Sequence, residues 1–557
     1  MERPPRIPKT QRAVQLVGPD ELRLNGSKPV PRPGPQQILC RVEAVGLCFS
    51  DLKLVKQFAA HPRKSEIVSG IDPAVLADVP SYVPGERPTV PGHEAAVRVC
   101  AVGDEVRGIR PGERYLVQTD YRWLRTAHSN ASFGYNFDGA LQEYVLLDQR
   151  VITSPSGEVM LLRASEHLAA SAIALVEPWA CVEDAYAEEQ RRTILAGGRM
   201  LVVAEADGAA AAVERLVAGC TPPAELVWVG RAPAASALDA VEMRDVSEVE
   251  DGTCDDLVYF GADAGAVERL FPKLAPRGIL NIVLSGARLG RPVMVPVGRV
   301  HYGGIRIVGT TGSDPRAAME AIPATAEIRP GARIDVVGAA GPMGVMHVIR
   351  SLCQGVPGVA VFAGDTDTSR LAALEQLAAP LAEARGLGFR AYNPARGERA
   401  EPCQYIVLMV PSPALVADAV ARCEPGGIIN VFAGIPADVS AEIDLDAYLE
   451  KQLYFVGTSG STLADMRSVL SKVEGGQLDT NVSVAAVSGL DGAIDGIRAI
   501  ERREIAGKVI VYPACRGLGL VGIDKLGDLA PDAARGPGEV WDRSAEDCLL
   551  RAFCAKG

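Results

Sequence analysis

The chain has 557 residues, enough for three or four structural units, and 48% of them are hydrophobic, as in globular proteins with sizeable cores. Its 57 basic and 69 acidic side chains leave a formal charge of −12, so the sequence lacks a basic footprint for nucleic acid or an anionic membrane. The twelve cysteines are scattered without close pairs, which predicts reduced thiols in a cytoplasmic protein rather than a disulfide framework.

The first predicted elements are short strands. Met1–Thr10 is polar and proline-rich, without the apolar core of a signal peptide, and no later apolar run is long enough to span a bilayer. Between residues 12 and 150, short apolar runs separated by proline and glycine predict a compact all-β domain; the clearest are Ile38–Val45, Ala95–Val102 and Tyr115–Gln118. Residues 160–195 are rich in Ala and Leu, with Glu and Arg between them, which predicts helix.

From residue 200 onward, predicted strands alternate with predicted helices, and the same order then occurs a second time. Such alternation predicts an α/β fold with parallel, doubly wound sheets. The predicted elements are Met200–Ala204, Ala209–Ala218, Leu226–Val229 and Leu257–Phe260, then Ile334–Val337, Met343–Leu352, Val359–Ala363 and Ile406–Val410. In the final segment, residues 514–557, one helix is predicted over Arg543–Phe553.

Two pairs of segments indicate an internal repeat. Gly278-Ile-Leu-Asn-Ile-Val resembles Gly427-Ile-Ile-Asn-Val-Phe, and Val308-Gly-Thr-Thr-Gly-Ser resembles Val456-Gly-Thr-Ser-Gly-Ser. Any two folds of this class share strands that begin or end in glycine. The common order of elements and the nearly identical six-residue segment favour a duplication.

Three residues from separate segments are candidate ligands of a catalytic zinc ion. Cys48, His93 and Glu177 offer a thiolate, an imidazole and a carboxylate, whose charges of −1, 0 and −1 would neutralise Zn²⁺. Ser50 is a candidate proton relay from a substrate hydroxyl, and Asp51 can orient the imidazole. Taken singly, each residue has a plainer interpretation: a small core cysteine, a loop histidine, a glutamate at a helix end.

In combination, the segments resemble the medium-chain dehydrogenase family, part of the alcohol dehydrogenase superfamily. In chain order they are Gly46-Leu-Cys-Phe-Ser-Asp, Pro91-Gly-His-Glu, Asp138-Gly-Ala-Leu-Gln-Glu-Tyr-Val and Glu177-Pro. The resemblance covers roughly residues 12–190 and 326–513 and implies a GroES-like catalytic domain and a Rossmann domain. Glu177 followed by Pro is similar to the sorbitol dehydrogenase and sorbose-1-phosphate-reductase-like branch.

The resemblance divides the chain into five expected parts. They are a GroES-like zinc domain (1–190), a degenerate Rossmann-like domain (191–325), an NAD-binding Rossmann domain (326–462), a return segment of the catalytic domain (463–513) and a C-terminal tail (514–557). Glu94 is a further candidate, either a transient ligand or a neighbour of the metal. Cys181 lies four residues after Glu177, on the same helical face, and is an alternative ligand.

The chain departs from the family in two places. The four-cysteine structural zinc lobe would fall near residues 112–137, but this stretch contains no cysteine, so one catalytic zinc and no structural zinc are expected. The separation of Cys48 and His93, 93 − 48 = 45 positions, is longer than in classical alcohol dehydrogenases. The additional loop contains His61-Pro-Arg-Lys64 and Glu66; it either covers the active site and supplies cations for a phosphate or carboxylate, or is a solvated surface loop.

A nucleotide site is predicted where the strand Ile334–Val337 runs into Gly338-Ala-Ala-Gly341-Pro342-Met343-Gly344 and then a helix. Glycines let the backbone approach a pyrophosphate, and the helix N-terminus attracts its charge. Asp365, 365 − 344 = 21 residues later, would bind the ribose diol and repel a 2′-phosphate, so NAD is favoured over NADP. Ala339 replaces a glycine of the strict pattern; Arg370 belongs to a segment that resembles the family.

The first copy has lost this pattern. Its turn, Val203-Ala-Glu205-Ala-Asp207-Gly-Ala, has two carboxylates where a pyrophosphate would lie, and their charge disfavours a dinucleotide. This copy is interpreted as structural, with an unrelated ligand as the alternative.

The expected function is reversible oxidation of a secondary alcohol on a polyol, sugar or sugar phosphate, with one zinc ion and NAD and without nucleic-acid or membrane partners. The alternatives are a threonine-like amino-alcohol dehydrogenase and a catalytically silent Rossmann scaffold or sensor.

The last strands of the two copies, Ile305–Thr310 and Tyr454–Thr458, suggest a reason for keeping the degenerate copy. In the family resembled, subunits commonly join through the last strand of each Rossmann sheet, which satisfies two exposed edges at once. We therefore expect the degenerate copy to be a built-in partner that pairs edge to edge with the cofactor-binding copy. The alternative is an outlying inserted domain, with dimerisation through residues 454–458 of two chains.

Overall fold

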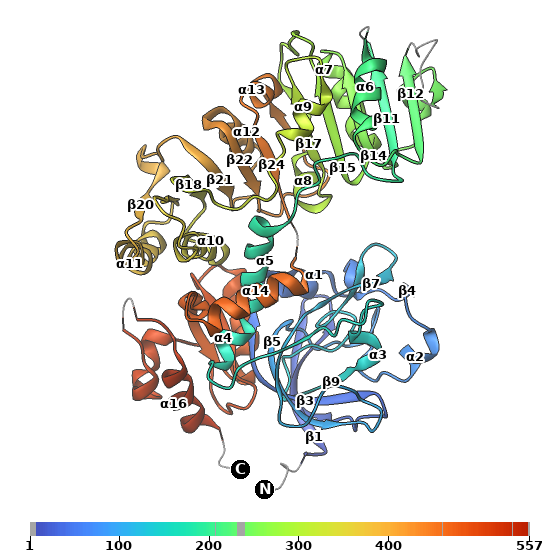
Figure 1. The fold of residues 1–557 in the computed structure, drawn as a ribbon. Coiled ribbons are helices and arrows are strands. Elements are labelled where there is room, and N and C mark those ends of the chain that lie inside the picture. The colour runs from blue at the N-terminus through green and yellow to red at the C-terminus, as the bar shows by residue number, and fades with distance from the viewer. Residues whose placement is uncertain (1–6, 206–207, 231–239, 459, 537–538, 555–557) are drawn as a thin grey trace. The chain divides into compact units, whose positions relative to one another are not determined.

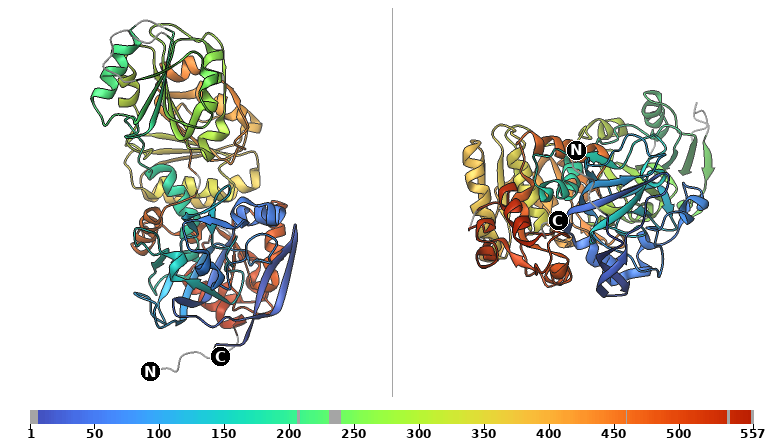
Figure 2. Two further views of the ribbon diagram at one scale, coloured as in Figure 1. Left: turned by 90° about the vertical axis from the view of Figure 1, so that its right-hand side faces the viewer. Right: turned by 90° about the horizontal axis from the view of Figure 1, so that it is seen from below.

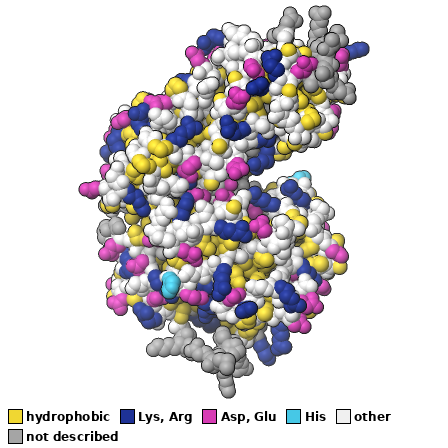
Figure 3. All heavy atoms as spheres, in the orientation of Figure 1, with side chains coloured by type: hydrophobic (Ala, Val, Ile, Leu, Met, Phe, Trp, Pro, Cys, Tyr) yellow, Lys and Arg dark blue, Asp and Glu magenta, His cyan; other side chains and the backbone are white. Residues whose placement is uncertain are grey.

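The computed structural model describes residues 7–205, 208–230, 240–458, 460–536 and 539–554. The chain divides into two compact units, unit 1 with Met1–Glu183 and Gly460–Gly557, and unit 2 with Asp184–Ser459. The first strands and the C-terminal helix α16 lie in the same unit in each view (Figures 1 and 2). On the face drawn in Figure 3, acidic and basic side chains are interspersed. Among the described residues, no helix combines the length and apolarity that crossing a membrane requires.

Unit 1 is built on an eight-stranded sheet with the order β10-β6-β5-β3-β26-β25-β27, in which β9 also pairs with β3. Its strands are β3 (Gln37–Leu47), β5 (Glu94–Val102), β6 (Arg114–Val117), β9 (Tyr144–Asp148), β10 (Leu161–Arg163), β25 (Val484–Ser488), β26 (Lys508–Val511) and β27 (Val521–Gly522). Beside it lie a hairpin, β1 (Thr10–Gly18) and β2 (Glu21–Pro29), and a small sheet of β4 (Ile67–Ser69), β7 (Asp120–Thr126) and β8 (Asn130–Ser132).

The helices of unit 1 are short. They are α1 (Phe49–Gln57), α2 (Pro73–Ala77), α3 (Gln149–Ile152), α4 (Ala170–Ala174), α5 (Val176–Ala187, in which the division between the units falls), α14 (Leu463–Glu474), α15 (Leu490–Glu501) and α16 (Arg543–Phe553).

Strand β3 joins the two parts of unit 1 that are distant in sequence. Its residues are almost all buried, because β5, β9 and β26 pair with it. Val509 lies opposite Leu47, and Val511 opposite Val45, so the strand after residue 500 completes a sheet begun near residue 37. This pairing holds Cys48, at the end of β3, beside the C-terminal part of the chain.

The prediction of one helical stretch over residues 160–195 is wrong in part. Leu161–Arg163 is the edge strand β10, which pairs with β6, and helix occurs only as α4 and α5. The apolar side chains of Leu161 and Leu162 are buried at the sheet, so tertiary packing overrides their helix propensity.

The C-terminal helix α16 has the bounds predicted from the sequence, and it packs against α4. The buried Glu546 carboxylate accepts hydrogen bonds from the backbone N–H groups of Ala170 (2.6 Å) and Ser171 (2.9 Å) at the start of α4. The Tyr512 hydroxyl donates to the same carboxylate at 2.9 Å. The tail therefore caps a buried helix, because a carboxylate satisfies N–H groups that have no partner inside the helix.

Unit 2 contains two six-stranded parallel sheets of the same order, β13-β12-β11-β14-β15-β17 and β20-β19-β18-β21-β22-β24. The first copy consists of β11 (Arg199–Ala204), α6 (Ala209–Ala218), β12 (Glu225–Gly230), β13 (Val241–Met243), β14 (Cys254–Phe260), α7 (Ala264–Leu270), β15 (Leu274–Val283), β16 (Val293–Val295), α8 (Val297–Tyr302), β17 (Arg306–Thr310) and α9 (Pro315–Glu320). The second consists of β18 (Arg333–Val337), α10 (Pro342–Cys353), β19 (Ala360–Gly364), α11 (Thr368–Ala384), β20 (Gly388–Tyr392), β21 (Cys403–Leu408), α12 (Pro413–Arg422), β22 (Cys423–Val431), β23 (Ala441–Ile443), α13 (Leu445–Glu450) and β24 (Tyr454–Val456).

The predicted duplication is confirmed by this common topology. The register also shifts at the same place in both copies, after the first residue of β14 and of β21. The repeated glycine lies where the backbone turns tightly: a Cβ on Gly278 would lie 2.9 Å from Ala275 O, and a Cβ on Gly427 would lie 2.7 Å from Glu424 O. The repeated sequence segments therefore correspond to the same tight backbone turn in both sheets.

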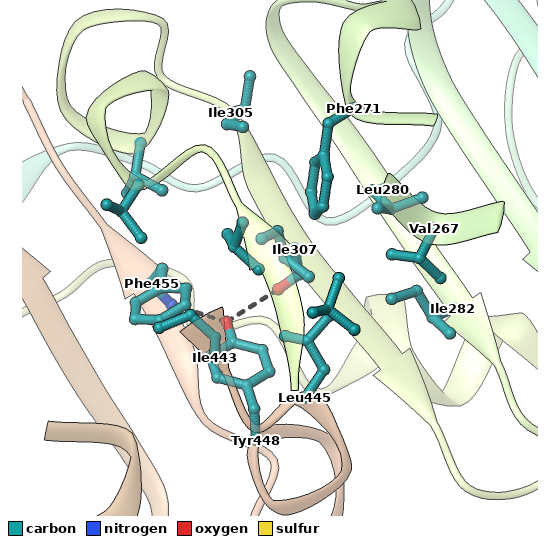
Figure 4. Close-up of a cluster of buried hydrophobic side chains, with 14 of the residues drawn as sticks. Val267, Phe271, Leu280, Ile282, Ile305, Ile307, Ile443, Leu445, Tyr448 and Phe455 are labelled. Atoms are coloured by element: carbon teal, nitrogen blue, oxygen red, sulfur yellow. Dashed lines mark hydrogen bonds between the residues drawn. The ribbon is translucent and has the colours of Figure 1, made fainter. Parts of the chain in front are cut away.

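The last strands of the two copies, β17 and β24, lie side by side, but they remain in separate sheets. The predicted direct backbone pairing of Ile305–Thr310 with Tyr454–Thr458 is therefore wrong. A side chain connects the strands instead. The Tyr448 hydroxyl donates to the Ile307 carbonyl and accepts from the Phe455 N–H, each at 2.9 Å (Figure 4).

Backbone pairing between the copies occurs at a different place. Strands β16 and β23 form a two-stranded antiparallel sheet, with Val293 opposite Ile443. Apolar side chains of both copies make one continuous core around this contact, including Phe271 and Ile307 of the first copy and Phe455 of the second (Figure 4).

Candidate active site

The start of helix α1 places two of the predicted residues. Cys48 precedes the helix, and its N–H donates to Asp51 Oδ2 (2.9 Å), which closes a capping box. The other carboxylate oxygen, Asp51 Oδ1, accepts from the Gly92 N–H (3.2 Å) and lies 3.0 Å from His93 Nδ1. Asp51 therefore ties the cysteine loop to the histidine loop.

The His93 ring is buried and held through both nitrogens. Its Nε2 lies 3.1 Å from Ser50 Oγ, while Nδ1 faces Asp51. Burial opposes the charged imidazole, but the adjacent Asp51 carboxylate raises the pKa of His93 well above its ordinary value. With Nδ1 committed to Asp51, Nε2 is the nitrogen that can coordinate a metal.

Glu94, the first residue of β5, brings a carboxylate to the same position. Its Oε1 accepts from Lys508 Nζ at 2.5 Å, while the buried Oε2 has no hydrogen-bond partner among the described residues. A Cβ on Gly46 would lie 2.0 Å from this Oε2, so the glycine leaves room for the carboxylate in its observed position. One ligand atom each of Cys48, His93 and Glu94 lie within 4.8 Å of one another.

Glu177, in the first turn of α5, lies outside that group of three but close to it. Its carboxylate is buried. Burial raises the pKa of Glu177 to about 7. The charge of His93 lowers this pKa, whereas the charge of Glu94 raises it further. Cys181 follows one helical turn later in the same helix.

These donors fit a zinc ion. A thiolate, an imidazole and a carboxylate are its usual catalytic ligands, and a buried carboxylate without hydrogen bonds is costly unless a cation compensates it. Glu94 Oε2 is an oxygen atom of this kind, and the Glu177 carboxylate beside it is also buried.

The additional loop is anchored at Lys64, whereas Glu66 and most of the residues up to 75 are exposed. It forms the short helices η1 (Phe58–Ala60) and η2 (Pro62–Lys64), and the buried Lys64 Nζ donates to the carbonyls of Val83 and, at 2.8 Å, Arg87. The His61 ring packs on Tyr135 at 5.0 Å between centroids, and the His93 ring packs on the same tyrosine at 5.7 Å.

Three residues of this surrounding were not identified from the sequence: Tyr135, Asp120 and Lys508. Tyr135 is buried, which raises its pKa, although His93, Arg63 and a hydrogen bond with Ser50 act in the opposite direction. No spacing or motif in the sequence marks these residues. Tyr135 comes from a loop, Asp120 from β7 and Lys508 from β26, and they meet only in the folded unit.

In unit 2, the predicted nucleotide turn joins β18 to α10. Gly338 has a φ of +84°, and a Cβ on Gly344 would lie 2.5 Å from Gly338 O, so both positions need glycine. Gly341 caps α10, and Pro342 and Met343 form its first turn and are half-buried. The turn thus leads into a helix N-terminus, the feature that attracts a pyrophosphate.

Asp365 follows the end of β19, beside this turn. Its Oδ2 accepts from the Ala340 N–H and its Oδ1 from the Asp367 N–H, each at 3.0 Å. Arg370, in the first turn of α11, lies 3.4 Å from Asp367. Asp365 therefore braces the turn as well as standing where a ribose-binding carboxylate is expected.

In the first copy, Glu205 at the end of the corresponding strand is bonded to a neighbouring side chain. Glu205 Oε2 accepts from the Tyr259 hydroxyl at 2.7 Å, and a Cβ on Gly261 would lie 2.5 Å from that oxygen. Asp207 lies outside the described residues.

Known proteins share the first part of unit 1. The alcohol dehydrogenase GroES-like domain model matches residues 34–156. Sorbitol dehydrogenase of Bos taurus is 33% identical over 106 residues, 19% of this chain and 24% of that protein. The uncharacterized protein YggP of Escherichia coli (strain K12) is 26% identical over 249 residues, 41% of this chain and 58% of that protein.

These matches span about a quarter and about three-fifths of the curated relatives' own lengths. Among solved structures, 2R,3R-butanediol dehydrogenase from Bacillus subtilis has a TM-score of 0.50 at 14% identity, covering 90% of this chain and 100% of that one. At this identity the likeness concerns the fold alone.

Proposed function

On the premise that the chain is a member of the medium-chain dehydrogenase/reductase superfamily, we propose that it is a zinc-dependent, NAD-linked dehydrogenase of secondary alcohols. The observation that carries the proposal is the group of Cys48, His93 and Glu94 donor atoms within 4.8 Å, with the buried Glu177 beside it. In this proposal Cys48, His93 and Glu177 hold the metal. Glu94 either replaces Glu177 transiently as a ligand or keeps its ion pair with Lys508.

The residues of unit 1 have distinct roles in such a reaction. When bound, zinc polarises the reacting hydroxyl and makes it more acidic. Ser50 Oγ, 3.1 Å from His93 Nε2 and hydrogen-bonded to the Tyr135 hydroxyl, takes the hydroxyl proton while giving up its own, and so relays it towards solvent. Asp51 keeps the His93 ring in one orientation, and Lys508 keeps the charge of Glu94 partly compensated.

The residues of unit 2 would hold the hydride acceptor. When bound, the nicotinamide cofactor takes the hydride from the substrate carbon. Residues 338–344 supply glycine backbone and the start of α10 for the pyrophosphate, and the Asp365 carboxylate favours a free ribose diol over a 2′-phosphate. Arg370 lies on the adjacent helix α11.

Metal analysis tests the metal assignment. We expect one zinc ion per chain in the wild type and less than a tenth of that in Cys48→Ala. A chelator titration that compares the zinc affinity of Glu177→Gln with that of Glu94→Gln identifies the third ligand. Substitution of the true ligand should weaken zinc affinity more. Two zinc ions per chain, or unchanged content in Cys48→Ala, would refute the assignment.

A dehydrogenase screen tests the reaction. Zinc-loaded protein should reduce NAD with polyols, sugars or their phosphates in preference to amino alcohols such as threonine. If no secondary alcohol is oxidised by protein that holds zinc, the chain is not a dehydrogenase, and the alternative of a silent scaffold is favoured.

A further inference from the structure

The long segment between Cys48 and His93 fixes one arginine near the aromatic ring on which His93 packs. The Pro62 carbonyl accepts from Thr126 Oγ1 at 3.0 Å, and Lys64 is anchored through its buried Nζ, so the backbone on both sides of Arg63 is held. The Arg63 side chain is 26% exposed and extends from this rigid turn.

Arg63 and His93 lie against the same aromatic ring. The Arg63 guanidinium carbon is 5.7 Å from the centroid of the Tyr135 ring, and the His93 ring is also 5.7 Å from it. Burial acts against the charged guanidinium, but Asp120 most strongly, and also Glu177 and Cys181, raise the pKa of Arg63. Arg63 thus lies within electrostatic range of the candidate zinc ligand Glu177.

A buried carboxylate compensates the Arg63 charge. Arg63 Nη1 donates to Asp120 Oδ1 at 2.6 Å, and Nη2 approaches Oδ2 at 3.4 Å. The Ser132 hydroxyl donates to the same Oδ1 at 3.0 Å, which fixes the carboxylate. Arg122, two residues further along β7, donates to the Ser461 carbonyl.

A fixed Arg–Asp pair suits hydroxyl groups better than anions. A hydroxyl can donate to the carboxylate and accept from the guanidinium, so neighbouring hydroxyls satisfy both partners. A phosphate dianion needs an uncompensated cation, and here it would meet Asp120 at contact distance from the guanidinium. The pair therefore favours an uncharged ligand over a charged one of similar shape.

We propose that Arg63 and Asp120 form a subsite that binds the non-reacting hydroxyl groups of an uncharged polyol and discriminates against phosphorylated or carboxylated analogues. This inference rests on the proposed dehydrogenase function and narrows its substrate class. It also explains the additional loop, which builds the turn that carries Arg63.

The first test compares a polyol with its own phosphate ester as substrates of the zinc-loaded enzyme. The wild type should have a kcat/KM for the polyol at least about tenfold higher than for the ester. Asp120→Asn keeps the shape but removes the charge, so it should shift this ratio towards the ester by about tenfold or more, through KM. Arg63→Gln should raise KM for the polyol, whereas Arg110→Gln, at an exposed arginine of the same unit, should leave the ratio unchanged.

The second test does not depend on turnover. Calorimetry with inorganic phosphate should detect binding to Asp120→Asn but not to the wild type or to the double variant Asp120→Asn/Arg63→Gln. A wild type that prefers the phosphate ester, or that binds phosphate in an Arg63-dependent manner, would overturn the proposal. If no alcohol is oxidised, the proposed function fails, while the calorimetric comparison still decides whether Asp120 suppresses anion binding at Arg63.

Discussion

At the scale of single residues, the candidate metal position depends on Asp51. One carboxylate caps α1 through the Cys48 N–H and orients His93 through Nδ1. Asp51→Asn removes the charge that fixes the imidazole, so we expect zinc affinity to fall by about 10–100-fold. Competition with a chelator measures this, with Asp104→Asn, at an exposed position of the same unit, as the control. Equal affinities in wild type and Asp51→Asn would contradict the role of Asp51.

A second residue-scale prediction concerns His347, which lies on α10 and is completely buried. Burial and, second, the charge of Arg350 lower the pKa of His347 to about 3, and the Tyr186 hydroxyl lies 2.9 Å from its Nδ1. The folded chain keeps this histidine neutral, whereas the unfolded chain protonates it below its ordinary pKa of about 6.5. Its contribution to stability is therefore complete above that pH and decreases as the pH falls towards 3.

Urea unfolding at pH 7 and pH 5 checks this sign. The wild type should lose up to about 2 kcal/mol more unfolding free energy between these pH values than His347→Gln. His128→Gln, at an exposed histidine, should behave as the wild type does. Parallel losses in the wild type and His347→Gln would show that His347 does not govern acid sensitivity.

At the scale of elements, the Asp365 carboxylate has two roles in the segment that runs from β18 through the turn and α10 to β19. Asp365 braces the turn through Ala340 N–H and stands at the end of β19, where a 2′-phosphate would be repelled. Asp365→Ala should lower the ratio of kcat/KM with NAD to that with NADP by about tenfold or more. Asp365→Asn keeps an oxygen that can accept from the Ala340 N–H but removes the charge. It therefore separates the effect of the charge on cofactor preference from the support that the side chain gives to the turn. A wild type that prefers NADP would show that Asp365 is misassigned.

The matching element of the first copy should bind no dinucleotide. Glu205 stands at the start of its turn, bonded to the Tyr259 hydroxyl, so a pyrophosphate there would meet a carboxylate. Calorimetric titration with NADH should therefore give one dinucleotide per chain. In the variant Gly344→Val, which crowds the second copy against Gly338 O, binding should be lost rather than halved. A stoichiometry of two would mean that the first copy is not degenerate in function.

At the scale of the whole molecule, the edges β17 and β24 are covered within one chain. Tyr448 bridges them, β16 pairs with β23, and one apolar core joins the copies, so neither edge is open for a second chain. We expect light scattering to give the mass of one chain. Tyr448→Phe leaves the Ile307 carbonyl and the Phe455 N–H without their partner, which should cost about 1–3 kcal/mol of stability. Tyr302→Phe, at a residue that is 44% exposed, is the control for stability. A dimer joined through residues 454–458 would contradict the interpretation of the first copy as a built-in partner.

The sequence by itself determined the features that depend on local spacing. The repeat, the strand–turn–helix order and the helix Arg543–Phe553 follow from periodicity and from glycines that only tight turns require. The ligand motifs brought Cys48, His93 and Glu94 into consideration, because Cys48 stands at a helix start, His93 follows a glycine and Glu94 is its direct neighbour.

Only the tertiary structure decided which distant side chains meet. Tyr448 rather than backbone pairing connects the two copies, Lys508 comes from β26 to compensate Glu94, and Asp120 neutralises Arg63 across the additional loop. Leu161–Arg163 became a strand because its edge of the sheet was open beside β6. Such contacts join residues tens to hundreds of positions apart, and their energies depend on burial and on partner geometry, which local sequence does not encode.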